Sequence, residues 1–180
     1  MTGARLETER LLLRRWKTSD LEPYAELCRD PEVMRHIGSG DTRSRDQCAR
    51  GIKAMERHWE EKGFGLFALE MRESGEFIGY TGLSEPDFLP QIMPAVEIGW
   101  RLSRRHWGKG YATEAARAAM QFGFDTLELP SIVSIFQLEN DASRRIVRKL
   151  GMDLDRLTQD PSCDRPVEVW RISVKDAARV

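Results

Sequence analysis

AVEIGWRLSRRHWGKG, the stretch that runs from residue 95 to residue 110, decides the fold of this chain. Over Ala95–Ser103 apolar side chains alternate with polar or small ones, and this period of two predicts a strand. A turn with two glycines, Arg105–Gly110, follows directly. From about Tyr111 onward small apolar residues recur at helical spacing, which predicts a helix that packs closely against a sheet. The sequence therefore predicts a strand, a glycine turn and a helix in immediate succession.

The glycine turn has the features of an anion site. Glycines let backbone N–H groups approach an anion closely, and the free N–H groups of the following helix point at the same place. Arg104, Arg105 and Lys109 add positive charge there. Two familiar phosphate motifs fail, because Gly110 stands where the P-loop needs Ser or Thr, and Thr113 stands where the dinucleotide fingerprint needs a third glycine or alanine. The turn therefore indicates a diphosphate without indicating either of those folds.

Helical and strand-like segments are mixed along the rest of the chain. Helices are expected to begin at two capping boxes, Ser19–Glu22 and Ser44–Gln47, and after Asn140 or Asp141. Strands are expected at Arg10–Trp16, Gly65–Arg72, Phe77–Leu83, Ser131–Leu138, Asp153–Thr158 and Val167–Val174. We therefore expect an α/β (α+β) fold with a mixed, largely antiparallel sheet flanked by helices, and we expect residues 1–180 to form a single domain.

Composition excludes several classes of protein. Lys and Arg number 28 against 29 Asp and Glu, so the net charge of -1 argues against a general nucleic-acid binder. Cys28, Cys48 and Cys163 are widely spaced, which argues against a disulfide framework and a zinc site. Met1–Arg10 lacks an apolar signal region, and no apolar run approaches the ~18 residues that span a bilayer. We expect a cytoplasmic protein with no metal, nucleic-acid or membrane partner.

Four blocks of sequence, in a fixed order, resemble a known family. They are LETERLLLR at residues 6–14, EIGWRL at 97–102, RHWGKGYATEA at 105–115, and Asn140-x-x-Ser143 followed by KLGM at 149–152. The middle blocks are similar to the acetyl-CoA-binding core of the GNAT superfamily of N-acetyltransferases, usually described as Q/R-x-x-G-x-G/A. The opening block resembles the subgroup related to ribosomal-protein N-terminal acetyltransferases. The resemblance covers essentially the whole chain.

The resemblance implies where acetyl-CoA binds. In such proteins the strand at Ala95–Ser103 splays away from the strand at Ser131–Leu138, and the pantetheine arm enters the gap like an added strand. Its backbone partners would be Ile98, Trp100 and Leu102, and Asn140 would hold the arm. The residues carried over as phosphate-binding are Arg105, Gly108, Lys109, Gly110, Ala112 and Thr113.

The resemblance also implies the chemistry. An amine must lose a proton before it attacks a thioester, and Glu97 is the best base in this sequence, directly or through a water. Many members of the family carry a tyrosine that protonates the leaving thiolate, but Val147 stands at that position. Ser143 is the alternative donor to the sulfur. Each assignment has a structural rival, since Glu97 also fits a surface carboxylate on a strand and Ser143 also fits a helix cap.

The expected function is transfer of an acetyl group from acetyl-CoA directly to a primary amine, either a peptide N-terminus or a small molecule. The alternative is a CoA-binding sensor or interaction module without catalysis, and Val147 at the tyrosine position keeps it open. The resemblance implies a monomer or a homodimer. The acceptor, the size of the acyl chain and the general acid are left open by the sequence.

Overall fold

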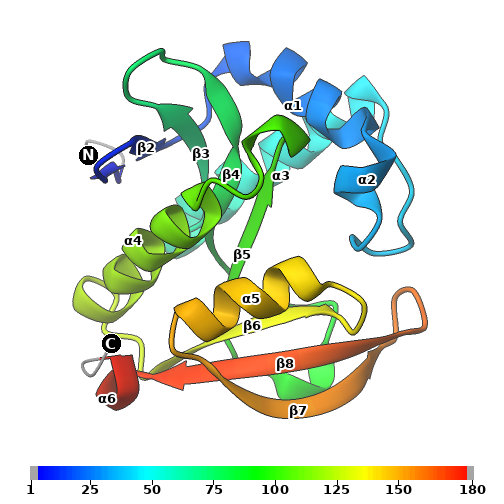
Figure 1. The fold of residues 1–180 in the computed structure, drawn as a ribbon, viewed down its shortest axis with the longest axis vertical. Helices are drawn as coiled ribbons and strands as arrows, with labels where there is room; N and C mark the ends of the chain where they lie inside the picture. Colours follow the sequence, from blue (N-terminus) through cyan, green and yellow to red (C-terminus); the bar gives the residue numbers. More distant parts are fainter. Residues whose placement is uncertain (1–3, 178–180) are drawn as a thin grey trace.

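The computed structural model describes residues 4–177, and within them one sheet of eight strands is flanked by helices (Figure 1). The order across the sheet is β1-β2-β3-β4-β5-β6-β8-β7, and every neighbouring pair is antiparallel except β5 and β6. The strands are β1 Leu6–Glu7, β2 Leu11–Arg14, β3 Leu66–Met71, β4 Phe77–Ser84, β5 Glu97–Leu102, β6 Ser131–Gln137, β7 Asp153–Asp160 and β8 Arg165–Ser173. The predicted mixed, largely antiparallel sheet is confirmed. Three residues at each end of the expected domain lie outside the described part.

The helices lie mainly where their sequence signals predict them. They are α1 Leu21–Arg29, α2 Pro31–Met34, α3 Arg45–Lys62, α4 Tyr111–Asp125, α5 Asp141–Lys149 and α6 Val174–Ala177, with single 3₁₀ turns at Thr18–Asp20, Pro90–Ile92 and Arg104–His106. The capping box before α3 is confirmed, because the Ser44 hydroxyl accepts from the Gln47 N–H and the Gln47 side chain accepts from the Ser44 N–H. The left-handed Gly63 (φ 78°) ends this helix.

The capping box predicted at Ser19–Glu22 is wrong, because Ser19 lies inside the 3₁₀ turn Thr18–Asp20 and the Glu22 carboxylate accepts from Arg45. Asp20 has a different role. The Asp20 carboxylate accepts two hydrogen bonds from the Arg14 guanidinium, at 2.7 and 2.8 Å, and one from the Lys17 N–H at 2.8 Å. Arg14 also donates to Glu70 at 2.6 Å. Asp20 is 2% and Arg14 8% exposed. This buried ion pair joins β2, the start of α1 and β3.

The two faces of β5 belong to two different apolar clusters. On one face Ile98 and Leu102 pack with Ala115, Ala116 and Ala119 of α4, all buried. The small alanine side chains let α4 lie close to the sheet, as the sequence predicts. The opposite face of β5 looks toward a second cluster beneath α1, which contains Tyr24, Cys28 and Tyr80. Both faces of this strand are therefore covered, and neither is a plain solvent face.

Between β5 and β6 the sheet is incomplete. The two strands share one register pair, Glu97 with Val133, and the Val133 N–H donates to the Val96 carbonyl at 2.9 Å. Beyond this pair β5 follows β4, while β6 pairs with β8 along its whole length, so the two strands diverge. Figure 1 shows the resulting gap, with α5 beside it. The expected splay of these strands is present.

Side chains join the two sides of the gap at its far end. The Gln137 side chain of β6 donates to the Gly38 carbonyl at 2.8 Å, in the segment after α2. Arg165 of β8 donates to the Gln137 side chain at 2.9 Å and to the Ser39 carbonyl at 2.6 Å. The gap is therefore bounded by backbone pairing at one end and by side-chain hydrogen bonds at the other.

Two kinds of feature are absent from residues 4–177. None of their helices combines the length and the apolar character that crossing a bilayer demands. In the same part of the chain, His, Cys, Asp and Glu side chains nowhere gather in a group of three or more suited to a metal ion.

Candidate active site

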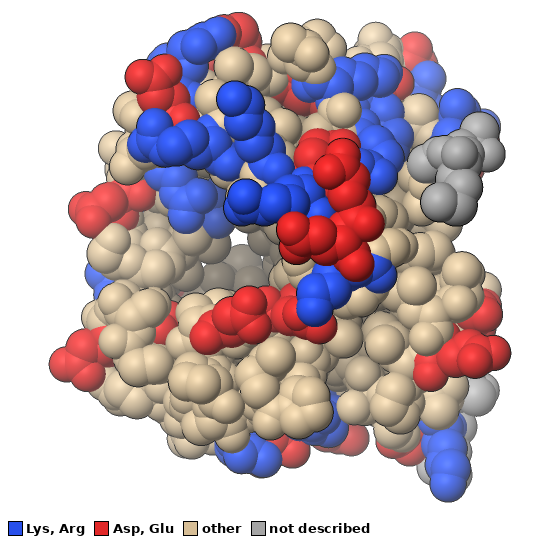
Figure 2. All heavy atoms as spheres, turned by 180° about the vertical axis from the view of Figure 1, so that it is seen from behind, with Lys and Arg blue, Asp and Glu red and all other residues tan. Residues whose placement is uncertain are grey.

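A cavity of about 500 Å³ lies between β5, the start of α4, α2 and the start of α5. Seen from behind, the surface is hollowed at the level of this gap, and residues of both charges border the hollow (Figure 2). Eight of the residues expected from the sequence to bind or react line the cavity, namely Trp100, Leu102, Gly108, Gly110, Ala112, Thr113, Asn140 and Ser143. The fold therefore brings together residues of β5, the glycine turn, the start of α4 and the start of α5.

The start of α4 presents free backbone donors to this cavity. Gly108 (φ 73°) and Gly110 (φ 85°) both adopt left-handed conformations, which glycine reaches without strain. Glu114 is the first residue of the helix whose N–H bonds back, to the Gly110 carbonyl at 3.0 Å. The N–H groups of residues 111–113 therefore have no partner inside the helix, and they lie at its positive end. This geometry suits an anionic group such as a diphosphate.

The same turn is fastened to the N-terminal strands by Arg10 and Glu114. Arg10 donates to the Lys109 carbonyl at 3.0 Å, and its Nε donates to Glu114 at 2.7 Å. Glu114 also accepts from Thr8 Oγ1 at 2.6 Å and from the Arg10 N–H at 2.9 Å. Burial alone would raise the pKa of Glu114, but these hydrogen bonds outweigh it and lower the pKa. Sequence reasoning missed this role, although Thr8 and Arg10 belong to the opening block that carried the resemblance.

Backbone groups of β5 face the gap at alternate residues. The Val96 carbonyl accepts from β6, whereas the Gly99 carbonyl accepts from Thr81 Oγ1 of β4 at 2.8 Å. Because backbone direction alternates along a strand, Ile98, Trp100 and Leu102 turn their N–H and C=O groups toward the gap. The Leu102 carbonyl already accepts from Trp107 Nε1 at 2.8 Å. The remaining groups form an edge that an extended ligand can pair with.

At the start of α5, Asn140 and Ser143 have different structural roles. The Asn140 side chain accepts from the Ser143 N–H at 3.0 Å and is the N-cap of the helix. The Ser143 hydroxyl is therefore not the cap, and Ser143 lines the cavity while 9% exposed. Val147, one turn further on, is fully buried in the apolar cluster with α4. This stretch of α5 supplies a hydroxyl to the cavity and no phenol.

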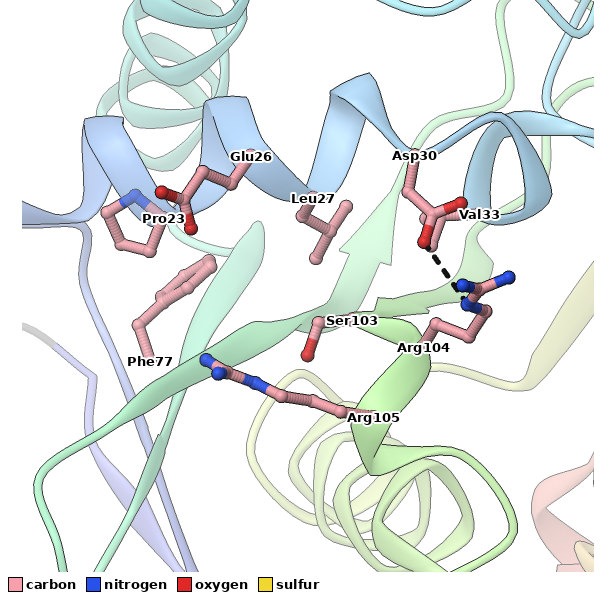
Figure 3. A pocket seen from close by; sticks show the side chains of 9 residues that line it. All are labelled: Pro23, Glu26, Leu27, Asp30, Val33, Phe77, Ser103, Arg104 and Arg105. Carbon is pink, nitrogen blue, oxygen red and sulfur yellow. Dashed lines mark ion pairs between the residues drawn. The ribbon is translucent and has the colours of Figure 1, made fainter.

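Four of the expected site residues do not line the cavity, and Arg105 is one of them. Its side chain is 69% exposed, forms an ion pair with Glu76 and lines a smaller pocket of about 290 Å³ beneath α1. Figure 3 shows Arg105 extending toward Phe77, beside an Arg104 that pairs with Asp30. The other three expected residues outside the lining are Glu97, Ile98 and Lys109. The backbone of the turn faces the cavity without the Arg105 guanidinium.

Glu97 lies where β5 and β6 begin to diverge, paired with Ser84 on one side and Val133 on the other. Burial raises the pKa of Glu97 to about 8, with a further increase from the charge of Asp160. The Ile135 N–H donates to the carboxylate and opposes this rise. A carboxyl group with such a pKa exchanges its proton near neutral pH, which is what a general base requires.

This raised pKa predicts a pH-dependent stability. The folded protein holds the Glu97 proton more tightly than the unfolded chain, whose pKa is near 4.5. The free energy of unfolding should therefore fall as pH rises from about 4.5 to about 8. Glu97→Gln, neutral at every pH, should match the wild type at low pH and exceed its stability above pH 8. Urea denaturation of both proteins across that range measures the difference, and parallel stability curves would contradict it.

Sequence reasoning also missed Arg101. It lines the cavity from the face of β5 opposite α4 and is only 8% exposed. Residues 97, 99 and 101 point to the same side of the strand, and the sequence therefore predicted Arg101 on a polar face. The available signal was a charged residue in the middle of a strand bounded by apolar segments.

Comparisons with known proteins agree with this geometry. The family model described as an acetyltransferase (GNAT) domain matches residues 10–153. The uncharacterized N-acetyltransferase p20 of Bacillus licheniformis is 30% identical and covers 94% of both chains. The acetyltransferase of Agrobacterium tumefaciens C58 has a similar structure, with a TM-score of 0.79, 30% identity and 94% coverage of both chains. RimL, a ribosomal alpha-N-protein acetyltransferase in complex with coenzyme A, has a TM-score of 0.77 at 14% identity and covers 97% of this chain and 99% of its own.

Proposed function

Because the chain belongs to the GNAT family of acetyltransferases, we propose that it transfers the acetyl group of acetyl-CoA directly to a primary amine. The observation that carries the proposal is the joint position of the β5–β6 gap and the free N-terminus of α4 on one cavity. The proposal takes residues 1–180 as one acetyltransferase domain. The acceptor is either a peptide N-terminus or a small-molecule amine.

The residues present fit acetyl-CoA. Free N–H groups at residues 111–113 suit its diphosphate, and the open edge of β5 at Ile98 and Trp100 suits the amides of its pantetheine arm. Asn140 and Ser143 line the opposite wall. The coenzyme A complex of RimL supports this assignment by likeness of fold. Bound acetyl-CoA supplies the thioester.

Transfer takes two protons from the acceptor nitrogen, one before attack and one as the amide forms, and returns one of them to the sulfur. Glu97 takes the first proton from the ammonium, directly or through a water, and the neutral nitrogen forms a bond to the thioester carbon as the C–S bond breaks. The second nitrogen proton passes to the departing sulfur, so that CoA leaves as its thiol. Ser143 lines the cavity, and we assign its hydroxyl as a hydrogen-bond donor to the departing sulfur. Because an unperturbed thiol has a pKa near roughly 8.5, the thiolate also leaves with little help. Val147 in place of a phenol is therefore compatible with turnover.

A ligand-binding measurement tests the proposal first. At about 100 times its dissociation constant, acetyl-CoA or CoA should add about 2.7 kcal/mol to the free energy of unfolding, which raises Tm by roughly 5–10 °C. ATP and NAD should have no such effect. Thermal unfolding with each of the four ligands, followed by mass spectrometry of a panel of peptides and amines with acetyl-CoA, gives the answer.

Ala112→Glu is the matched control. It sets a carboxylate at the start of α4, where negative charge favours the helix but repels a diphosphate. This variant should fold and lose the shift with both CoA forms. An equal shift with ATP or NAD, or none with CoA, would reject the proposed site. A shift with CoA but no acetylation of any amine would favour the non-catalytic alternative.

A further inference from the structure

Arg101 is a buried cation without an anionic partner. It is 8% exposed, and none of the ion pairs found within residues 4–177 includes it. Its Nη1 donates only to Cys28 Sγ, at 3.7 Å, and its Cζ lies 5.2 Å from the centroid of the Tyr80 ring. Its Nε is buried and has no hydrogen-bond partner in the described part of the chain. Buried arginines are normally paired, because an unpaired charge is costly to bury.

The groups around Arg101 do not supply a negative charge at neutral pH. Burial raises the pKa of Tyr24 and of Tyr80, so both phenols stay neutral. Arg43 acts on the same two tyrosines and adds a second positive charge nearby. Arg43 is likewise absent from the ion pairs found in residues 4–177. None of these three groups therefore gives Arg101 a negative charge, and Arg101 is among the residues that line the cavity.

Arg101 shares a face of β5 with Glu97. The two lie four residues apart, about 13 Å between Cα atoms, and side chains at every second residue of a strand point the same way. Gly99 lies between them, and a Cβ added there would meet no atom within 4 Å. Tyr80, directly opposite Arg101 in the sheet, is close enough to Glu97 for its charge to act on the phenol. Free space beside Gly99 thus lies between Glu97 and Arg101 on this face.

We propose that the amine acceptor carries a carboxylate, and that Arg101 binds this carboxylate while the amine lies at Glu97. This inference rests on the proposed function and names the class of acceptor. The planar guanidinium fork matches a carboxylate with two hydrogen bonds, and one negative charge balances the one buried positive charge. A polyamine is disfavoured in this pose, because its second ammonium would lie beside the Arg101 guanidinium.

The experiment compares amines that differ only in this charge. The probes are glycine, β-alanine, γ-aminobutyrate and ε-aminocaproate, each beside its carboxamide, with spermidine as the cationic probe. For at least one chain length, wild-type kcat/KM should be about 10- to 100-fold higher for the carboxylate than for the amide. Arg101→Met should remove this preference by lowering kcat/KM for the carboxylate alone. Its KM for acetyl-CoA should stay unchanged.

Two further variants isolate the role of the guanidinium. Arg101→Lys keeps the charge but loses the fork, so the preference should be reduced without being abolished. Arg57→Met removes an exposed positive charge on α3 and should leave the preference intact. Thermal unfolding with CoA confirms that each variant is folded. Equal rates with carboxylate and amide in the wild type, or a preference for spermidine, would overturn the inference. So would a loss in Arg101→Met that appears in the KM for acetyl-CoA, because Arg101 would then belong to the CoA site.

Failure of the proposed function can be distinguished from failure of the carboxylate site. If no amine is acetylated, calorimetry of the same amino-carboxylates with the protein–CoA complex replaces the assay. Binding that disappears in Arg101→Met would uphold the carboxylate site while the catalytic proposal falls. No binding to the wild-type complex would overturn the carboxylate site as well.

Discussion

Replacing Glu97 by Gln is expected to lower kcat by about 10²- to 10⁴-fold, the usual contribution of a general base. The reason is that Gln cannot accept the proton that the ammonium must lose. The change is close to isosteric, so the Ile135 N–H keeps an acceptor. Steady-state kinetics with any amine found to be acetylated measures this effect, and the affinity for acetyl-CoA should remain within a few-fold of the wild type.

The pH profile separates catalysis from structure. Glu97 works only when ionised, so wild-type kcat should rise with pH and level off above about 8. In Glu97→Gln this rise should be absent. Glu60→Gln, on an exposed position of α3, removes a carboxylate without touching the site and should keep both the rate and the profile. Unchanged turnover of Glu97→Gln over the full pH range would remove Glu97 from the mechanism.

Asp20→Ala is expected to cost about 3–5 kcal/mol of unfolding free energy, the range for removing one partner of a buried ion pair. The guanidinium of Arg14, which is 8% exposed, would lose two of its four hydrogen bonds and keep those to Glu70 and to the Arg15 carbonyl. For a chain of this size such a loss corresponds to a fall in Tm of about 10 °C. Urea denaturation and thermal unfolding both measure it.

A surface pair provides the comparison. Glu22 and Arg45 also form an ion pair, but their side chains are 64% and 52% exposed. Glu22→Ala should therefore cost less than about 1 kcal/mol. The double variant Arg14→Met/Asp20→Leu should be more stable than Asp20→Ala alone, because it removes both charges of the pair while Glu70 keeps its ion pair with Lys17. Equal stabilities of Asp20→Ala and Glu22→Ala would show that the buried pair adds nothing.

Local signals were sufficient for much of the fold. Alternation predicted β5, the left-handed glycines predicted the turn before α4, and the box at Ser44 predicted the start of α3. These features depend on residues that are neighbours in the sequence. Helix α1 begins at Leu21, within the predicted box, but the cap was wrong because Glu22 is drawn to Arg45 of α3, which no local pattern contains. The short elements β1 and α2 carry too few residues to show a period.

The candidate site could be predicted only in part. Family motifs identify Glu97 and the turn, but the raised pKa of Glu97 depends on burial by distant strands. Arg105 was expected at the phosphate, and its side chain is instead drawn to Glu76. Arg101 appeared to lie on a polar face, because the sequence does not show that α1 covers that face. Tertiary packing decides which face of a strand is covered, and therefore which side chains become buried.

The single register pair between β5 and β6 has a consequence for cooperativity. Strands β1–β5 and β6–β8 are two blocks whose ladders are continuous within each block and nearly absent between them. The blocks are held together by a shared apolar cluster and by the side-chain hydrogen bonds at the far end of the gap. A ligand that pairs with the free edge of β5 would add backbone hydrogen bonds to these contacts. A co-substrate bound in this gap would thus bridge the two blocks, and local opening between them should become rarer as the site fills.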